Sequence, residues 1–209
     1  MPQVPQLVER VRQVTLDQPD TLGDGDCEAL RAGLIGQPAN TLSSFAYVGA
    51  GTWLATRIPG LPRASRRGAT AYAALAAVTG AGSVAYHGPQ FEGAQFFHDV
   101  PILGVLGIGL ALPLWRRSRR QVPLPGWSTR LGAVMAASAA VAGVAYVAGG
   151  TDSRWCRPES LLQLHGVWHL GTAAVVGIWG VALWAPVDEH ADDGTEELAT
   201  TGGARGVDR

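Results

Sequence analysis

Five stretches that are almost free of charged residues constrain this chain more than any other feature. They cover residues 38–56, 68–87, 94–115, 131–150 and 160–184. A helix of about 20 apolar residues crosses the hydrocarbon core of a bilayer, and each stretch is close to that length. Only 16% of all residues are charged, against about 25% in soluble domains, which excludes an ordinary soluble enzyme. We therefore predict an all-α fold, a polytopic membrane helix bundle with five transmembrane helices.

The arginines of the connections predict how these helices are oriented. Every one of the 16 basic residues is arginine. Nine lie in the connections 57–67 and 116–130, whereas the connections 87–93 and 151–159 hold two. Positively charged loops stay in the cytoplasm, so we place the N-terminus outside and the C-terminus inside. The net charge of −1 gives no argument for a nucleic-acid partner.

The remaining residues divide the chain into three parts. Residues 1–35 lack a signal-peptide pattern, so we predict an extracytoplasmic N-terminal segment. Residues 36–186 form the transmembrane helical domain. Residues 187–209 are acidic and rich in Gly and Thr, a composition that predicts a disordered cytoplasmic tail. We expect an integral protein of a bacterial plasma membrane.

Two cysteines, Cys27 and Cys156, both fall on the predicted outer side. An oxidising exterior allows them to pair, which would tie the N-terminal segment to the connection before the last helix. Two unrelated free thiols are the alternative, because spacing in the sequence does not reveal geometry.

Ionisable side chains in the apolar stretches gather at one membrane face. Such groups are costly inside a bilayer and mark functional sites. Under the predicted topology, these residues all lie at outer helix ends: His87, His98, Asp99, His165 and His169. We therefore predict a functional site near the extracytoplasmic face.

Three of the histidines form a candidate zinc site. His165 and His169 are four residues apart, so one helix face presents both imidazoles, and His87 supplies a third from a neighbouring helix. Three imidazoles with one open position are typical of catalytic zinc. Zinc lowers the pKa of a bound water to about 7 and makes it a nucleophile. For any single histidine, the alternative is a polar side chain reaching the membrane surface.

Two further residues complete the predicted site. The H-x-x-x-H motif lacks the glutamate of H-E-x-x-H, so we assign Asp99 to position the water and carry its proton. Ser83 precedes His87 by one helical turn and is assigned to hydrogen-bond the developing oxyanion. The glycines beside Ser83 also fit a role in close helix packing. His98 is left outside the ligand set, as a supporting or interfacial residue.

Three sequence blocks carry a resemblance to a known family. They are Cys27-Glu28 with Asn40-Thr41-Leu42-Ser43-Ser44, then Gly82-Ser83-Val84-Ala85-Tyr86-His87 with Asp99, and finally His165-Gly166-Val167-Trp168-His169. Together they resemble the alkaline ceramidase family, in the superfamily that includes the adiponectin-receptor-like proteins. The resemblance implies a zinc amidase that cleaves a sphingolipid to a fatty acid and a sphingoid base. It implies zinc on His87, His165 and His169, with Ser83 and Asp99 in the roles given above.

The chain departs from that family in two respects. The family has seven membrane helices, where we predict five; both numbers are odd, so the orientation is the same. Some members bind calcium through an acidic cluster in the N-terminal segment. Asp24, Asp26 and Glu28 are present here, but Gln37 stands where the pattern has a carboxylate. That exchange argues against calcium, and a solvated acidic turn explains the cluster equally well.

Other functions remain open at this stage. A non-catalytic lipid-binding or sensory membrane protein could keep zinc for structure. A haem-binding electron-transfer protein could use two histidines as iron ligands, although two ligands one turn apart on one helix do not sandwich a haem. No feature identifies the lipid itself, so an N-acyl lipid other than ceramide fits as well.

Overall fold

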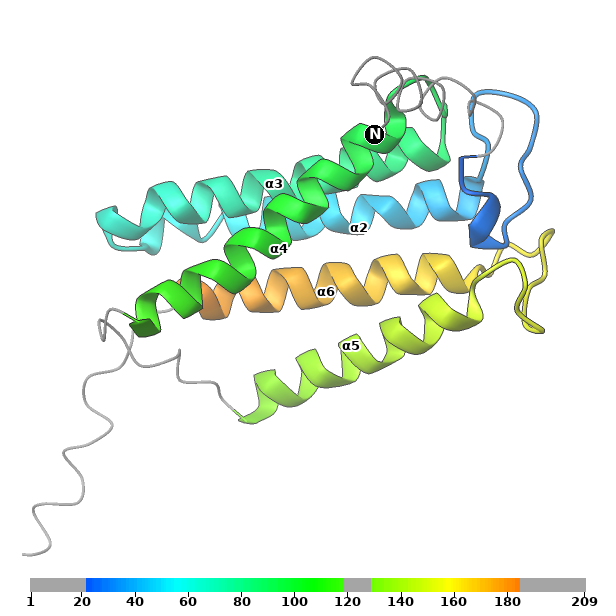
Figure 1. The fold of residues 1–209 in the computed structure, drawn as a ribbon. Coiled ribbons are helices and arrows are strands. Elements are labelled where there is room, and N and C mark those ends of the chain that lie inside the picture. The colour runs from blue at the N-terminus through cyan, green and yellow to red at the C-terminus, as the bar shows by residue number, and fades with distance from the viewer. Residues whose placement is uncertain (1–21, 119–128, 185–209) are drawn as a thin grey trace, which may run out of the picture.

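The computed structural model describes residues 22–118 and 129–184. Within them the chain forms five long helices and no strand (Figure 1). The elements are η1 (Asp24–Asp26), α2 (Pro38–Ala55), η2 (Ile58–Gly60), α3 (Arg63–His87), α4 (Ala94–Ser118), α5 (Thr129–Ala148) and α6 (Leu164–Trp184). The all-helical prediction is confirmed for these residues. Residues 1–21 and the predicted tail 187–209 lie outside the described residues.

Two helices begin at residues other than those predicted from the apolar stretches, because polar side chains bind the backbone at their starts. α3 begins at Arg63, five residues before the predicted stretch. Its first turn is held by Arg66, which donates to the carbonyl oxygens of Leu61 and Pro59 at 2.9 and 2.8 Å. α6 begins only at Leu164, because the side chain of Gln163 closes the preceding turn by donating to backbone carbonyls. Hydropathy alone does not predict either set of hydrogen bonds.

Four of the five helices, α3 to α6, are long and apolar enough to cross a membrane. α2 is not among them, since polar residues occupy its first half: Asn40, Thr41, Ser43 and Ser44. α2 packs against both α3 and α6, where Asn40 and Ser44 are fully buried. Among the described residues there are thus five long helices, as predicted, and apolar character supports a membrane crossing for four of them rather than five.

α2, α3 and α6 form a closely packed unit. Its core includes Leu54, Tyr72 and Leu183. Small residues bring the backbones together, and a Cβ on Gly51 of α2 would lie 2.6 Å from the carbonyl oxygen of Ala73 in α3. Such small-residue contacts are the usual way in which membrane helices approach one another.

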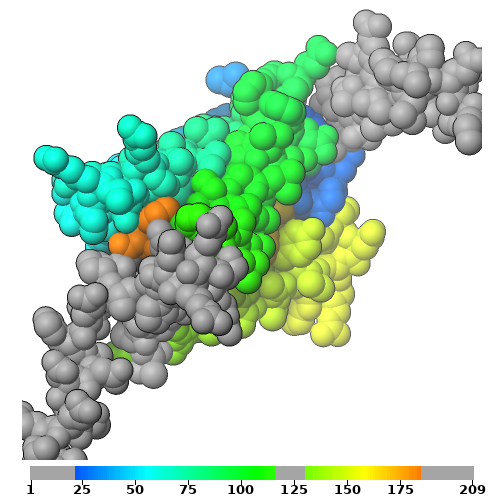
Figure 2. All heavy atoms as spheres, turned by 60° about the vertical axis from the view of Figure 1, so that its left-hand side comes forward, coloured from blue at the N-terminus to red at the C-terminus, as the bar shows by residue number. Residues whose placement is uncertain are grey.

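α4 and α5 cover this unit from outside. α4 packs mainly on α3, and α5 mainly on α6. Figure 2 shows α4, in green, lying across one face of the molecule, with part of α6, in orange, visible beside it. Both outer helices expose large apolar side chains, among them Leu110 of α4 and Val144 of α5.

Residues 22–37 fold back over one end of the bundle, at the right in Figure 1. Backbone N–H groups of Gly36 and Gln37 donate to the carbonyls of Gly88 and His87 at the end of α3. The predicted disulfide between Cys27 and Cys156 is present, and its Cα atoms are 5.4 Å apart. We call this end, made of residues 22–37, 88–93 and 149–163, the site end. The connection 56–62, which contains Arg57 and η2, lies at the opposite end.

Candidate metal centre

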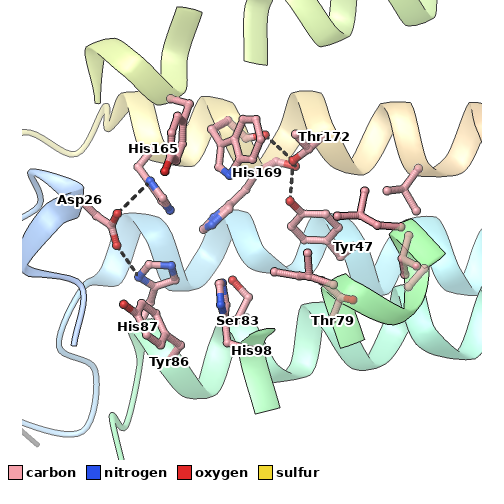
Figure 3. Close-up of a pocket in the computed structure, with 17 residues that line it drawn as sticks. Asp26, Tyr47, Thr79, Ser83, Tyr86, His87, His98, His165, His169 and Thr172 are labelled. Carbon is pink, nitrogen blue, oxygen red and sulfur yellow. Dashed lines mark hydrogen bonds and ion pairs between the residues drawn. The ribbon is translucent and has the colours of Figure 1, made fainter. Parts of the chain in front are cut away.

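The three histidines predicted as ligands meet at the site end. His87 is the last residue of α3, and His165 and His169 lie in the first two turns of α6. All three are buried, and one nitrogen from each lies within 4.8 Å of the others. Figure 3 shows the three rings pointing toward a shared space. These residues could hold a metal ion.

Each ring has its Nδ1 atom occupied by a partner from α2 or the N-terminal segment. The pairs are His87 with Gln37 Oε1 at 2.7 Å, His165 with Asp26 Oδ1 at 3.2 Å, and His169 with Ser43 Oγ at 2.9 Å. Such partners fix the tautomer and the ring orientation of metal-binding histidines. None of the three was singled out from the sequence as supporting a ligand.

The hydrogen-bond network shows which ring nitrogen carries the proton. The amide nitrogen of Gln37 donates to the carbonyls of Gly23 and Glu28, so its oxygen accepts from His87. The hydroxyl of Ser43 donates to the carbonyl of Asn40, so its oxygen accepts from His169. A neutral imidazole has one donor nitrogen and one acceptor nitrogen. Nδ1 is therefore the donor, and Nε2 keeps its lone pair.

The Nε2 lone pairs that no hydrogen bond uses are suited to a metal ion. Nε2 of His87 is buried and has no hydrogen-bond partner among the described residues. A buried polar atom without a partner is rare and calls for an explanation. A metal ion bound by the three Nε2 atoms provides one, and imidazole nitrogen is a good ligand for zinc and for copper, iron and nickel.

Asp26 is the carboxylate that the structure places beside the histidines. Its two oxygens lie 3.2 Å from Nδ1 of His165 and 3.9 Å from Nδ1 of His87, as the dashed lines in Figure 3 show. Burial raises the pKa of Asp26 to about 6. In the sequence, Asp26 belonged to a possible calcium cluster. Its neighbour Cys27 was the available signal, because the disulfide draws this segment to the site end.

Two other residues of that cluster serve the fold. Both carboxylate oxygens of Glu28 accept backbone N–H groups, from Ala39 at 2.7 Å and from Asn40 at 2.8 Å. A negative charge at the N-terminus of a helix is favourable because the helix dipole is positive there. Glu28 thus caps α2, and Gln37 joins the same segment to His87.

Ser83 lies where the sequence placed it, one turn before His87 and facing the candidate centre (Figure 3). It is buried, and its Oγ is 2.8 Å from Oγ of Ser44. Ser44 donates to the carbonyl of Asn40. The hydroxyl of Ser83 therefore donates to Ser44 in this arrangement.

The structure does not bring Asp99 to the three histidines. Its side chain is 52% exposed, and its Oδ1 accepts a hydrogen bond from Nδ1 of His98 at 2.7 Å. It is His98 that lines the cavity next to the ligands, with its ring stacked on Tyr86 at 4.6 Å. Successive residues of a helix point about 100° apart, so α4 turns one of these two neighbours inward and the other outward.

A cavity of about 350 Å³ extends from the histidines into the bundle. Its polar end holds the ligands, His98, Ser83 and Asp26, and its other end is largely apolar. The apolar end is lined by Ala76, Ile102, Val105, Leu106 and Val176. The cavity thus joins a polar, metal-capable end to space suited to a hydrocarbon chain.

Comparison of the chain with protein-family models, curated proteins and solved structures finds no match in any of the three. The chemistry of the centre therefore has to be inferred from its own residues.

Proposed function

We propose that this chain is a zinc-dependent membrane amidohydrolase, similar in chemistry to the alkaline ceramidases, that cleaves an N-acyl lipid to a fatty acid and an amine. One observation carries the proposal: three buried histidines bring one nitrogen each within 4.8 Å of the others at the polar end of a largely apolar cavity, and Nε2 of His87 has no hydrogen-bond partner among the described residues. A lipid amide has the matching shape, with a polar carbonyl and nitrogen joined to a long apolar chain.

Zinc held by His87, His165 and His169 would polarise the amide carbonyl and activate a water molecule. Ser83 lies in the same cavity and would turn its hydroxyl from Ser44 toward the carbonyl oxygen as that oxygen gains negative charge. A preorganised donor at a developing oxyanion typically contributes about 10²–10³ in rate. Farther along the cavity wall, the hydroxyls of Tyr47 and Thr172 hydrogen-bond to each other at 2.5 Å. Neither hydroxyl is therefore left unpaired there.

The surroundings of the site support a lipid substrate and an outer location. α4 and α5 border the cavity with Leu106 and Tyr146, and both helices expose apolar side chains. The Cys27–Cys156 disulfide is characteristic of an oxidising compartment, which agrees with placing the site end outside the cytoplasm. We therefore propose that substrate reaches the cavity from the outer half of the bilayer.

Metal content and lipid turnover test this proposal together. Detergent-purified wild type, His169→Ala and Leu170→Ala are analysed by elemental mass spectrometry. Leu170 is the control, since it neighbours His169 but is 55% exposed. We expect about one zinc per chain in wild type and Leu170→Ala and none in His169→Ala.

The same samples are then assayed for fatty acid release from ceramides, N-acyl ethanolamines and N-acyl amino acids. We expect turnover of at least one class by wild type and none by His169→Ala. Bound zinc without turnover on any of these lipids would replace the hydrolase by a zinc-containing lipid-binding or sensory protein. Wild type without stoichiometric metal, purified in the absence of chelators, would overturn the proposal altogether.

A further inference from the structure

A fourth histidine at the cavity has no part in the metal centre. His98 comes from α4, and its ring centroid lies 6.2 Å from that of His87. It lines the cavity with the ligands (Figure 3) but does not belong to the group of three nitrogens within 4.8 Å. An amide hydrolase needs a group that accepts a proton from water and returns it to the departing nitrogen.

His98 is oriented for such a transfer by its neighbour in sequence. Oδ1 of Asp99 lies 2.7 Å from Nδ1 of His98. A carboxylate accepts hydrogen bonds, so Nδ1 of His98 carries the hydrogen and Nε2 keeps a lone pair. Stacking on Tyr86, with an angle of 28° between the rings, holds the imidazole plane.

The other titratable groups of the cavity wall are already engaged. Each of the three candidate ligands has its Nδ1 engaged by a supporting partner, and its other ring nitrogen would hold the metal. Asp26 faces the Nδ1 atoms of two of those ligands. Of the three tyrosines, Tyr47 hydrogen-bonds to Thr172, and the Tyr86 hydroxyl accepts from the backbone of Gly23. The ring of Tyr146 packs against Trp168, and its side chain has no basic nitrogen. Among the described cavity residues, His98 has a basic nitrogen to offer.

We propose that His98 is the proton-transfer residue of the proposed hydrolysis and that Asp99 acts through it as a positioning residue. This inference rests on the proposed function. As the water oxygen bonds to the amide carbon, one of its protons moves to Nε2 of His98. The same proton then passes to the amide nitrogen as the C–N bond breaks, and the products are a carboxylic acid and an amine. No oxidant or reductant takes part.

Substitution of the two residues separates this role from metal binding. His98→Gln and His98→Asn remove the basic nitrogen but leave the zinc ligands in place. We therefore expect both variants to keep the wild-type zinc content and to bind the product fatty acid as tightly as the wild type does. Turnover is expected to fall about 10²- to 10⁴-fold, the usual contribution of general acid–base catalysis. Asp99→Asn is expected to lose about 10- to 100-fold, as for other residues that orient a functional histidine, and Asp99→Glu to recover part of the loss.

The tautomer of His98 gives a readout that does not depend on turnover. In protein with ¹⁵N-labelled histidine, we assign the His98 resonances from their absence in His98→Gln. We expect wild-type His98 to show a protonated Nδ1 and an unprotonated Nε2. In Asp99→Asn this preference is expected to weaken, while the resonances of the three ligands stay in place.

The outcomes distinguish the inference from the proposed function. Wild-type turnover by zinc-loaded His98→Gln overturns the inference alone. Loss of zinc in both His98 variants also overturns it, because His98 would then be a ligand. If zinc-loaded wild type cleaves none of the lipids, the proposed function is overturned, and so is the proton-transfer role that rests on it.

Discussion

The bundle has a packed part, α2, α3 and α6, which buries polar side chains, and an outer part, α4 and α5, which exposes apolar ones. In the most apolar windows of α3 and α6, 44% and 39% of the residues are buried, whereas the corresponding fractions for α4 and α5 are 17% and 11%. α2, α3 and α6 bury polar groups such as Asn40, Ser44 and Ser83 in a shared interior. α4 and α5 present large apolar residues on their outer faces.

This difference assigns separate tasks to the two parts. The candidate metal ligands come from α3 and α6, and their supporting partners come from α2 and the disulfide-tied residues 22–37. The outer helices contribute His98 and much of the apolar cavity wall. We therefore expect metal affinity to depend on the packed part and substrate choice on the outer part.

The largest expected effect is on stability and comes from removing the disulfide that ties the segment before α2 to the connection before α6. Replacing both cysteines, Cys27→Ser with Cys156→Ser, opens a covalent link across a sequence separation of 129 residues. Loss of a native disulfide typically costs about 2–5 kcal/mol. We expect a clear fall in the midpoint of thermal unfolding in detergent, measured by tryptophan fluorescence.

The same double variant is expected to bind zinc more weakly, because Asp26 and Glu28 flank Cys27 and are held by the link. Added zinc should restore part of the lost thermal stability, since a ligand that binds the folded state stabilises it. An unchanged midpoint and unchanged zinc affinity would mean that backbone hydrogen bonds alone keep the segment in place.

Glycine substitutions compare the packing of the two parts directly. A Cβ on Gly51 of α2 would lie 2.6 Å from backbone atoms of α3, whereas a Cβ on Gly143 of α5 meets nothing within 4 Å. Overpacking typically costs about 1–3 kcal/mol, so Gly51→Ala should lower the unfolding midpoint. Gly143→Ala should leave it unchanged or raise it, because alanine favours a helix over glycine by about 1 kcal/mol. Equal losses in both variants would contradict the division into a packed and an outer part.

Much of this arrangement follows from the sequence because its causes are local. Apolar length predicted the five helices, and the four-residue spacing of His165 and His169 predicted that they share a helix face. His87 was predicted to join them because a helix end sets its depth in the membrane. The Cys27–Cys156 pairing was predicted from the topology of the two outer connections.

What the sequence could not predict depends on tertiary contacts. α2 was counted as a membrane helix like the others, although two polar residues of its first half, Ser43 and Ser44, hydrogen-bond to His169 of α6 and Ser83 of α3. Asp99 was assigned to proton transfer, and His98 was left as a supporting or interfacial residue, because residue type does not show which way α4 is rotated. Asp26 lies 139 residues from His165, Ser43 lies 126 residues from His169, and Gln37 lies 50 residues from His87, so no local pattern marks these three as partners of the histidines.

Two serines sharpen the distinction between holding the metal and acting on substrate. Ser43 accepts from Nδ1 of His169 at 2.9 Å, whereas Ser83 is hydrogen-bonded to Ser44. Loss of a residue that supports a metal ligand typically costs about 10- to 100-fold in affinity or activity. We expect Ser43→Ala to weaken zinc binding by that order, measured by competition with a chromophoric chelator. Ser83→Ala should keep its zinc affinity and lose turnover; weaker zinc binding in Ser83→Ala would instead place this serine among the metal's supports.

The smallest expected effect concerns the outer part, where the proposed substrate chain would lie. Leu106 of α4 lines the cavity and is 52% exposed, while Leu110, one turn farther along, is 63% exposed and outside the cavity lining. Leu106→Trp should shorten the apolar end and shift kcat/KM toward shorter acyl chains. A single methylene in an apolar pocket is worth about 1–3 kcal/mol at most, and a partly exposed wall should give only a few-fold shift. Leu110→Trp is the control and should leave the chain-length profile unchanged, with zinc content equal in both variants. A shift caused equally by both tryptophans would show that the outer surface of α4, rather than the cavity, selects the lipid.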